Sequence, residues 1–328
     1  MENALNSACI LKQKYRIIDV IGHGGYGITY KVKDVNTDKE YAIKEFFPKQ
    51  IVKRAEDGIN IELREKRFAT TYRKLIKQFL FEARFLAGFA FQKNIVSIYE
   101  FFEENQTAYF VMELLKGVDL RQYIKKNKVN KFSVSINRAI DIIKQILNGL
   151  KEIHNANVVH CDIKPSNIFV EKNGNIKIID FGLAKKMDDM NVLGMTQMYV
   201  APEVISGDRT DSYSDVYSAG IIMYELLTLR CPPDAALRLN GVSVTEPMEY
   251  NNQIPSELND IIMKAIELEP HKRFANTTEF NDAIEGKSKL KTVKHLNENI
   301  KRIKMGIYAI FIVSVIFFLV SIILFFIL

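Results

Sequence analysis

The sequence predicts an α+β protein with one hydrophobic helix at its C-terminal end. Two short β-like runs, residues 15–21 and 28–32, enclose a glycine-rich turn, and a third run ends at Lys44. Apolar side chains then recur at helical spacing over residues 75–86. The final residues, 306–328, contain no charged side chain. These strands, the helical pattern and the uncharged terminus are the observations on which the fold prediction depends.

The composition is that of an ordinary globular protein. The chain has 328 residues, of which 48% are hydrophobic and 26% charged, so it can bury a large core and is not a disordered sequence. Cys9, Cys161 and Cys231 are far apart and have no CxxC spacing, which excludes a disulfide framework and a zinc site and fits a reducing, cytosolic setting. Residues 1–14 lack the apolar run of a signal peptide, so we expect no export of the main domain.

Residues 305–328 are predicted to form a transmembrane helix. The stretch from Gly306 to Leu328 has 23 uncharged residues, and at about 1.5 Å per residue it spans a bilayer core of about 30 Å. The alternative is a buried core helix, but such helices are rarely apolar on every face over this length. The helix has no GxxxG pair, so the oligomeric state stays open. We expect no further domain beyond it.

The segment before this helix, residues 285–304, is strongly basic. It carries seven Lys or Arg residues against two Glu, whereas the whole chain has a net charge of only +6. The rest of the chain is therefore nearly neutral, and the basic pI indicates an anionic membrane surface and no nucleic acid partner. Basic flanks stay on the cytoplasmic side, which predicts a single-pass, C-terminally anchored protein with its main domain cytoplasmic. The alternative is a solvated linker that happens to be basic.

The glycine-rich turn comprises Gly22, Gly24, Gly25 and Gly27. Glycine lets a backbone close over phosphates and offer N–H groups without a side chain in the way. The spacing GxGxxG alone is a weak signal, because dinucleotide-binding folds share it. In those folds a helix follows the glycines, whereas residues 28–32 are strand-like here. A hairpin that covers phosphates is therefore favoured.

A hairpin of this kind requires a lysine on the next strand, and Lys44 in the sequence Tyr-Ala-Ile-Lys supplies it. Glu82 lies on the helical pattern of residues 75–86, so we expect an ion pair between Lys44 and Glu82. Taken singly, each would more often be an exposed charge. The 37 residues 45–81 are a longer connection than usual and predict an extra hairpin or loop of unassigned role.

The most specific motifs lie in the second half of the chain. Residues 159–169 read VHCDIKPSNIF, residues 177–182 read KIIDFG and residues 201–203 read APE. The order GxGxxG, AIK, HxDxKxxN, DFG and APE resembles the protein kinase superfamily over residues 15–284. The sequences AIKEFFP and CPPDA are similar to those of bacterial relatives of the eukaryotic-type Ser/Thr protein kinases.

The resemblance implies a bilobal α+β fold. Its small lobe, residues 15–112, is an antiparallel sheet with one helix, the αC helix of the family. Its large lobe, residues 116–284, is mainly helical. Residues 1–14 are then an N-terminal extension of the kinase domain.

Phosphoryl transfer requires that the protein position the reacting groups and neutralise the negative charge of the triphosphate. By motif position, the resemblance makes Asp162 the residue that orients the acceptor hydroxyl and takes its proton, and Lys164 the partner of the γ-phosphate. Lys44, held by Glu82, binds the α- and β-phosphates. A lysine at position 164 is typical of Ser/Thr kinases, so the expected substrates are Ser or Thr hydroxyls of proteins, the kinase itself among the candidates.

The expected cofactors are ATP and Mg²⁺, with Mn²⁺ as an alternative metal. Asp180 and Asn167 are the implied metal ligands. The implied nucleotide-binding residues come from the glycine turn, the neighbouring strands, the hinge and the base of the cleft: Ile21, Gly22, Gly24, Gly25, Gly27, Thr29, Ala42, Lys44, Met112, Glu113, Leu115 and Phe169. The hinge backbone between Glu113 and Leu115 would bind adenine.

Three further positions have implied structural roles. Glu203 with Arg273, and Asp215 on its own, resemble the buried ion pair and the loop anchor of the large lobe. Cys161 stands where many kinases have the arginine that receives an activating phosphate, and residues 183–195 contain no Ser, Thr or Tyr. We therefore expect activity that does not depend on phosphorylation of this loop.

Two other functions fit parts of the sequence. A pseudokinase would keep the fold and act as a membrane-bound binding platform, because fold alone does not establish activity. The presence of Lys44, Asp162, Asn167 and Asp180 argues against it. A small-molecule kinase of related fold is the other alternative, and the APE sequence at residues 201–203 speaks against that one.

Overall fold

The computed structural model describes residues 3–129, 134–180, 197–208 and 210–286. The chain divides into two compact units, Met1–Phe280 and Asn281–Leu328. Within the described residues, no helix is long and apolar enough to cross a membrane. The predicted membrane helix, nearly all of the basic segment before it and the loop of residues 183–195 lie outside the described residues.

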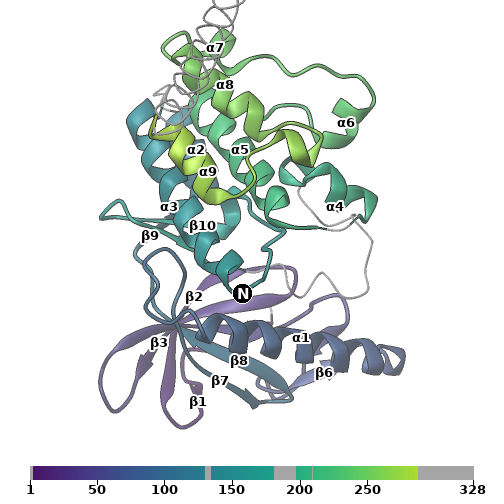
Figure 1. Cartoon of the computed structure of the whole chain (residues 1–328). Coiled ribbons are helices and arrows are strands. Elements are labelled where there is room, and N and C mark those ends of the chain that lie inside the picture. Colours follow the sequence, from purple (N-terminus) through teal and green to yellow (C-terminus); the bar gives the residue numbers. More distant parts are fainter. Residues whose placement is uncertain (1–2, 130–133, 181–196, 209, 287–328) are drawn as a thin grey trace, which may run out of the picture. The chain divides into compact units, whose positions relative to one another are not determined.

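The small lobe is built on one antiparallel sheet of six strands in the order β1-β2-β3-β4-β8-β7. Its strands are β1 (Ile10–Leu11), β2 (Tyr15–His23), β3 (Gly27–Asp34), β4 (Glu40–Phe46), β7 (Ile98–Glu104) and β8 (Thr107–Met112). The predicted antiparallel small-lobe sheet is confirmed, and β2 and β3 flank the glycine turn as expected (Figure 1).

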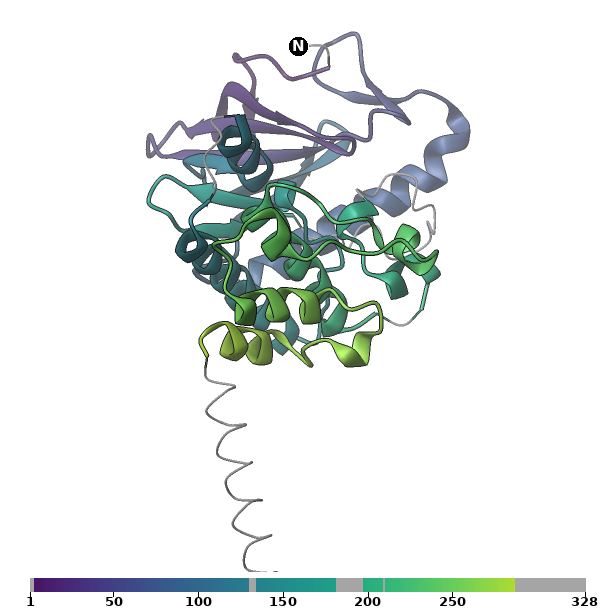
Figure 2. The same cartoon turned by 90° about the horizontal axis from the view of Figure 1, so that it is seen from above.

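The long connection after Lys44 forms a hairpin and then a helix. Strands β5 (Val52–Arg54) and β6 (Ile61–Leu63) pair antiparallel, and the turn η1 (Lys66–Phe68) leads into helix α1 (Ala69–Ala87). The predicted extra hairpin is therefore confirmed. Helix α1 packs beside β7 and β8, where the Phe79 ring lies 5.3 Å from the Phe46 ring and 5.0 Å from the Phe110 ring (Figures 1 and 2).

Strand register gives this sheet two different faces. Residues directly opposite each other on neighbouring strands project to the same face. Lys44 lies opposite Phe110, against which α1 packs, so Lys44 projects to the inner face. Glu45, the next residue, projects to the outer face.

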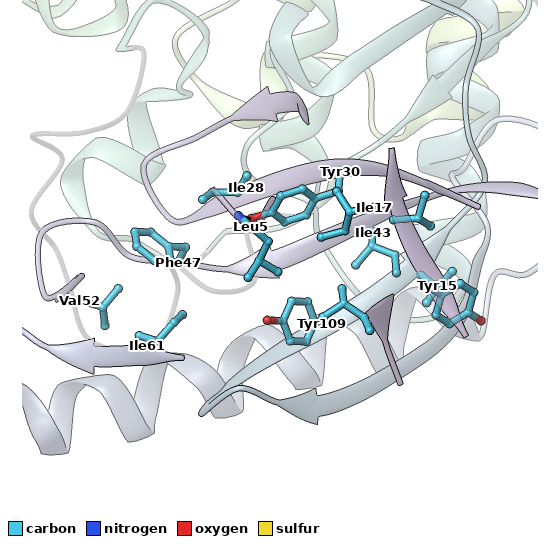
Figure 3. Close-up of a cluster of buried hydrophobic side chains, with 13 residues drawn as sticks. Leu5, Tyr15, Ile17, Ile28, Tyr30, Ile43, Phe47, Val52, Ile61 and Tyr109 are labelled. Atoms are coloured by element: carbon cyan, nitrogen blue, oxygen red, sulfur yellow. Dashed lines mark hydrogen bonds between the residues drawn. The ribbon is translucent and has the colours of Figure 1, made fainter. Parts of the chain in front are cut away.

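The outer face carries its own hydrophobic core, which the N-terminal segment and the hairpin cover (Figure 3). Its buried side chains come from both ends of the small lobe: Leu5, Leu11, Tyr15, Ile17, Ile28, Tyr30, Val32, Ile43, Phe47, Val52, Ile61, Tyr109 and Val111. Alternation of apolar residues along β3 and β4 places half of each strand in this cluster. Residues 3–14, which the sequence predicted to be an extension outside the lobe, are thus part of the folded small lobe.

The large lobe is mainly helical and also contains a small sheet of order β11-β10-β9. Its elements are β9 (Gly117–Asp119), α2 (Leu120–Val129), α3 (Ile136–Asn155), η2 (Pro165–Asn167), β10 (Ile168–Glu171), β11 (Ile176–Ile178), η5 (Gln197–Tyr199), α4 (Pro202–Ser206), α5 (Ser212–Thr228), α6 (Ala235–Leu239), α7 (Pro247–Tyr250), α8 (Ser256–Ala265), η6 (Pro270–Lys272) and α9 (Thr277–Ile284).

Helix α5 forms the centre of this lobe, because it packs against both α3 and α8 and is buried on nearly every side. Gly220 permits the close approach to α8: a Cβ atom at that position would lie 2.8 Å from the Cβ of Ala265. The helix is therefore a fixed support for Asp215, which lies in its N-terminal half and contacts the loop of residues 160–167.

The two lobes also join behind the hinge. Ile95 pairs in parallel with Ile178 of β11, and the Val96 N–H donates to the Ile178 carbonyl at 2.9 Å. The Ile178 N–H donates to the Asn94 carbonyl at 2.9 Å. The segment that follows α1 is therefore fastened to the large lobe beside the candidate site.

Candidate active site

The glycine turn between β2 and β3 is closed by its own backbone. The Gly24 N–H donates to the Gly27 carbonyl at 2.8 Å, and the Phe47 N–H donates to the Tyr26 carbonyl at 2.8 Å. A Cβ atom at Gly27 would lie 2.6 Å from the carbonyl oxygen of Glu45, so only glycine fits there. The turn is thus held directly over the strand that carries Lys44.

The predicted nucleotide-binding side chains of the sheet share its inner face. Thr29 lies opposite Lys44, Ala42 lies opposite Met112, and Gly22 lies opposite Thr29. Ile21 at the end of β2 is 48% exposed. Phe169, which belongs to the large lobe, is half-buried on β10. The register therefore brings Gly22, Thr29, Ala42, Lys44 and Met112, from four strands, onto one face of the sheet.

The hinge contributes backbone groups. The Glu113 side chain points away from the cleft, since it accepts from the Ser97 N–H at 2.8 Å and pairs with Lys177 at 2.8 Å. Its own N–H donates to the Ser97 carbonyl. Within the described residues, the Glu113 carbonyl and the Leu115 N–H have no hydrogen bond to the protein, so both are available to an adenine ring.

Lys44 forms its ion pair with Asp180, with the ammonium nitrogen 3.0 Å from Oδ1. The expected ion pair between Lys44 and Glu82 stays a prediction, although the charge of Glu82 does act on Lys44. Burial alone would lower the pKa of Lys44, but the charges of Asp180 and then Glu82 outweigh it and raise that pKa. Glu82 is 4% exposed and still acts on Lys44 through its charge.

The catalytic loop brings together the three predicted residues Asp162, Lys164 and Asn167. The Lys164 ammonium lies 2.8 Å and 2.9 Å from the two Asp162 carboxylate oxygens. The Asn167 amide donates to the Asp162 carbonyl at 2.9 Å and to its carboxylate at 3.1 Å. These bonds fix the orientation of the Asp162 carboxylate, which is almost fully buried.

Asp215, at the start of α5, anchors this loop. Its carboxylate accepts the N–H of His160 at 2.9 Å and the N–H of Cys161 at 2.8 Å, and it lies 2.7 Å from His154 Nε2. Cys161 has a φ of 60°, a conformation that costs a non-glycine residue about 1–3 kcal/mol. Burial would raise the pKa of Asp215, but the His154 hydrogen bond and neighbouring positive charge and N–H groups lower it.

Glu203 and Arg273 form the expected buried ion pair. Two parallel bonds of 2.9 Å join the guanidinium to the carboxylate, and Ser214 donates a third bond to Glu203. The remaining Arg273 donors reach the carbonyls of Tyr213, Glu267 and Leu268. Burial would raise the pKa of Glu203, but the Arg273 bonds lower it.

Sequence reasoning missed two groups around the site. Lys177 ties the hinge to the segment after α1, since it pairs with Glu113 and donates to the Ile95 carbonyl at 3.1 Å. Glu45 is fully buried and pairs with Arg54. A charged residue on the apolar face of a strand, between Ile43 and Phe47, was the signal that could have identified Glu45.

The groups that could hold a metal are Asp180 and Asn167. The Asp180 side chain is 42% exposed, and the Asn167 amide nitrogen is engaged by Asp162, which leaves its oxygen as the ligating atom. Within the described part of the chain, no cluster of three or more His, Cys, Asp or Glu could hold a metal alone. Two oxygen ligands beside a lysine suit Mg²⁺ that is shared with phosphate oxygens.

Comparisons with known proteins agree with this geometry. A probable serine/threonine-protein kinase of Clostridium acetobutylicum is 31% identical over 84% of this chain, and serine/threonine-protein kinase PrkC of Bacillus subtilis is 32% identical over 80%. The chain spans 40% and 38% of the lengths of these two relatives.

Two solved structures share the fold. The apo form of PpkA-294 has a TM-score of 0.78 at 26% identity, with 86% of this chain and 99% of that one covered. The PknI kinase domain of Mycobacterium tuberculosis has a TM-score of 0.62 at 19% identity, with 86% and 99% covered, and supports the fold alone. Residues 15–284 match the family described as protein kinase domain. The chain therefore belongs to the protein kinase family and has bacterial serine/threonine-protein kinases among its homologues.

Proposed function

We propose that the chain transfers the γ-phosphate of Mg-ATP to Ser or Thr hydroxyls of proteins while it is tethered to a membrane. The observation that carries the catalytic part is the hydrogen-bonded group of Asp162, Lys164 and Asn167 beside the Lys44–Asp180 pair. A structure that only bound partners would not need the Asp162 carboxylate to be held in one orientation by Lys164 and Asn167.

The chain's own residues would bind the nucleotide through charge and backbone donors. The glycine turn offers N–H groups to the phosphates, and the Lys44 ammonium supplies a positive charge at the α- and β-phosphates. The Glu113 carbonyl and the Leu115 N–H would bond the adenine edge, with Ala42 above the ring and Phe169 below it.

Asp180 and Asn167 would hold Mg²⁺, or Mn²⁺ as an alternative, and Glu82 would support Lys44 from α1. The metal supplies neutralisation of the negative charge on the phosphate oxygens. The ion pair between Lys44 and Asp180 supports this role, because a carboxylate that attracts one cation can also attract a metal ion.

Asp162 would orient the acceptor hydroxyl and take its proton. The hydroxyl oxygen forms a bond to the γ-phosphorus, the bond from that phosphorus to the β,γ-bridging oxygen breaks, and ADP leaves. Lys164 lies within 3 Å of the Asp162 carboxylate, so its ammonium is placed to neutralise charge on the moving phosphoryl group.

The test is phosphate transfer by the full chain and by its Asp162→Asn variant, with the chain itself and a generic Ser/Thr protein as acceptors. Loss of the proton acceptor should lower kcat by about 10²–10⁴-fold with little change in ATP binding. Asp141→Asn, on the exposed side of α3, is the matched control and should retain activity. ATP binding without transfer by the unaltered chain would favour the pseudokinase platform.

The membrane tether is carried by the sequence of residues 285–328. An uncharged stretch of 23 residues after a basic segment fits a single-pass anchor with the kinase domain in the cytoplasm. The full chain should sediment with membranes through a high-salt, alkaline wash, and a chain that ends at residue 304 should not. Release of the full chain by that wash would refute the anchor.

A further inference from the structure

The outer face of the small-lobe sheet contains a fully buried carboxylate with four donors. Glu45 Oε2 accepts from Arg54 Nη2 at 2.7 Å and from the Tyr30 hydroxyl at 2.7 Å. Glu45 Oε1 accepts from Arg54 Nη1 at 2.9 Å and from the Tyr109 hydroxyl at 2.9 Å. Burial raises the pKa of both tyrosines, so both hydroxyls keep their protons at neutral pH. We call Glu45, Arg54, Tyr30 and Tyr109 the Glu45 network.

The Glu45 network also fastens the N-terminal segment. Arg54 Nε and Nη2 donate to the Asn3 carbonyl at 3.1 Å and 2.9 Å. The Leu5 N–H donates to the Tyr30 hydroxyl at 3.1 Å (Figure 3). Leu5 is 3% exposed, within the outer core. The residues that match the kinase family begin at position 15, so this segment is an addition to the family domain.

A buried ion pair is a poor source of net stability, because desolvation offsets most of the attraction and apolar residues of similar size often serve as well. What directional bonds provide is a fixed geometry. Here they join the separate hairpin of β5 and β6 to three strands that the main sheet already pairs with one another, β3, β4 and β8.

Two of these segments lead directly to the candidate active site. Glu45 is the residue after Lys44 on β4, and consecutive residues of a strand project to opposite faces. Fixing Glu45 from outside therefore fixes the strand that presents Lys44 inside. Arg54 belongs to the hairpin that continues into α1, the helix that carries Glu82.

We infer that Glu45 and Arg54 are positioning residues for ATP: they set where Lys44 meets the triphosphate and where Glu82 stands to support Lys44, and Asn3 and Leu5 complete the clamp. This inference rests on the proposed function. Neither residue touches the nucleotide side of the sheet, and both act through β4 and α1.

The test separates positioning from stability by comparing single and double variants of the full chain in detergent. Arg54→Met leaves the Glu45 carboxylate buried without its cation. This change should lower the urea concentration at the unfolding midpoint and raise the KM for ATP. The double variant Glu45→Leu, Arg54→Met removes both charges and should recover part of the unfolding midpoint, because no buried charge is left unpaired while the Tyr30 and Tyr109 hydroxyls still lose their acceptor. It should still show a KM for ATP raised by about tenfold, because small displacements in a site are costly.

Arg64→Met is the matched control. Arg64 lies just after β6 and its Nε donates to the Lys49 and Val52 carbonyls, so its loss weakens the same hairpin without touching Glu45. Its KM for ATP should stay within about twofold of the unaltered chain. Deletion of residues 2–9, which removes Asn3 and Leu5, should raise the KM in the same direction as Arg54→Met.

A double variant with both midpoint and KM restored would overturn the inference and leave the network a purely structural role. Equal KM values for ATP in the Arg54→Met and Arg64→Met variants would also overturn the inference. Failure of the proposed function is a separate result: the unaltered chain would then transfer no phosphate. In that case direct titration with Mg-ATP still compares the nucleotide affinity of the variants.

Discussion

The anchor of the catalytic loop gives the sharpest prediction. Asp215→Asn keeps the size of the side chain but leaves one oxygen where the carboxylate has two. The His160 N–H and the Cys161 N–H bond to different oxygens, at 2.9 Å and 2.8 Å. Whichever way the amide is turned, one buried backbone N–H then faces an NH₂ group.

The magnitude follows from these bonds. A hydrogen bond to a charged acceptor contributes about 1.5–3 kcal/mol, and a buried donor without an acceptor costs about 1–3 kcal/mol. Since the two figures describe the same contact and are not added, we expect Asp215→Asn to lower the free energy of unfolding by about 1.5–3 kcal/mol. The loop that holds Asp162 should also relax, because the bond to the Cys161 N–H stabilises its φ of 60°. We expect kcat to fall by about 10–100-fold.

The assay is urea unfolding of the full chain in detergent, together with steady-state phosphate transfer. A second substitution, Cys161→Gly, removes the cost of the left-handed conformation and should return about 1–2 kcal/mol to the Asp215→Asn variant. If the Asp215→Asn variant has the same free energy of unfolding and the same kcat as the unaltered chain, the anchoring role is refuted. If adding Cys161→Gly does not raise the free energy of unfolding of the Asp215→Asn variant, backbone strain at Cys161 is excluded as a cause of its lower stability.

Two further predictions concern stability. Arg273→Met should lower the free energy of unfolding by about 3–5 kcal/mol, because it leaves the Glu203 carboxylate buried without its cation, and adding Glu203→Leu should restore part of that loss in urea titrations. Equal midpoints for the single and double variants would contradict this account. Burial lowers the pKa of His160, although Asp215 and other carboxylates oppose it. The folded state thus binds fewer protons than the unfolded one, and stability should fall as the pH drops below about 6.5. A His160→Asn variant should flatten that slope between pH 7 and pH 5.5, and an unchanged slope would show that other groups cause it.

The sequence by itself determined the family, the order of the elements and the catalytic loop. Asp162, Lys164 and Asn167 lie within six residues of each other, so local chain geometry alone brings them together. The glycine turn and Lys44 were also predictable, because neighbouring strands with alternating apolar residues have little freedom of register. Each of these features depends on short-range pattern.

Only the tertiary structure decided which charges pair over long distances. Lys44 of β4 pairs with Asp180 at 3.0 Å, a partner 136 residues away that the sequence did not predict, because the packing of the small lobe on the large lobe brings the two side chains together. The Glu45–Arg54 ion pair joins the outer face of a strand to an inserted hairpin, and the spacing of the two residues in the sequence does not predict it. The partner of a charged side chain depends on how whole helices and strands pack against each other. That packing results from many weak contacts between residues far apart in the sequence, so no local sequence pattern predicts it.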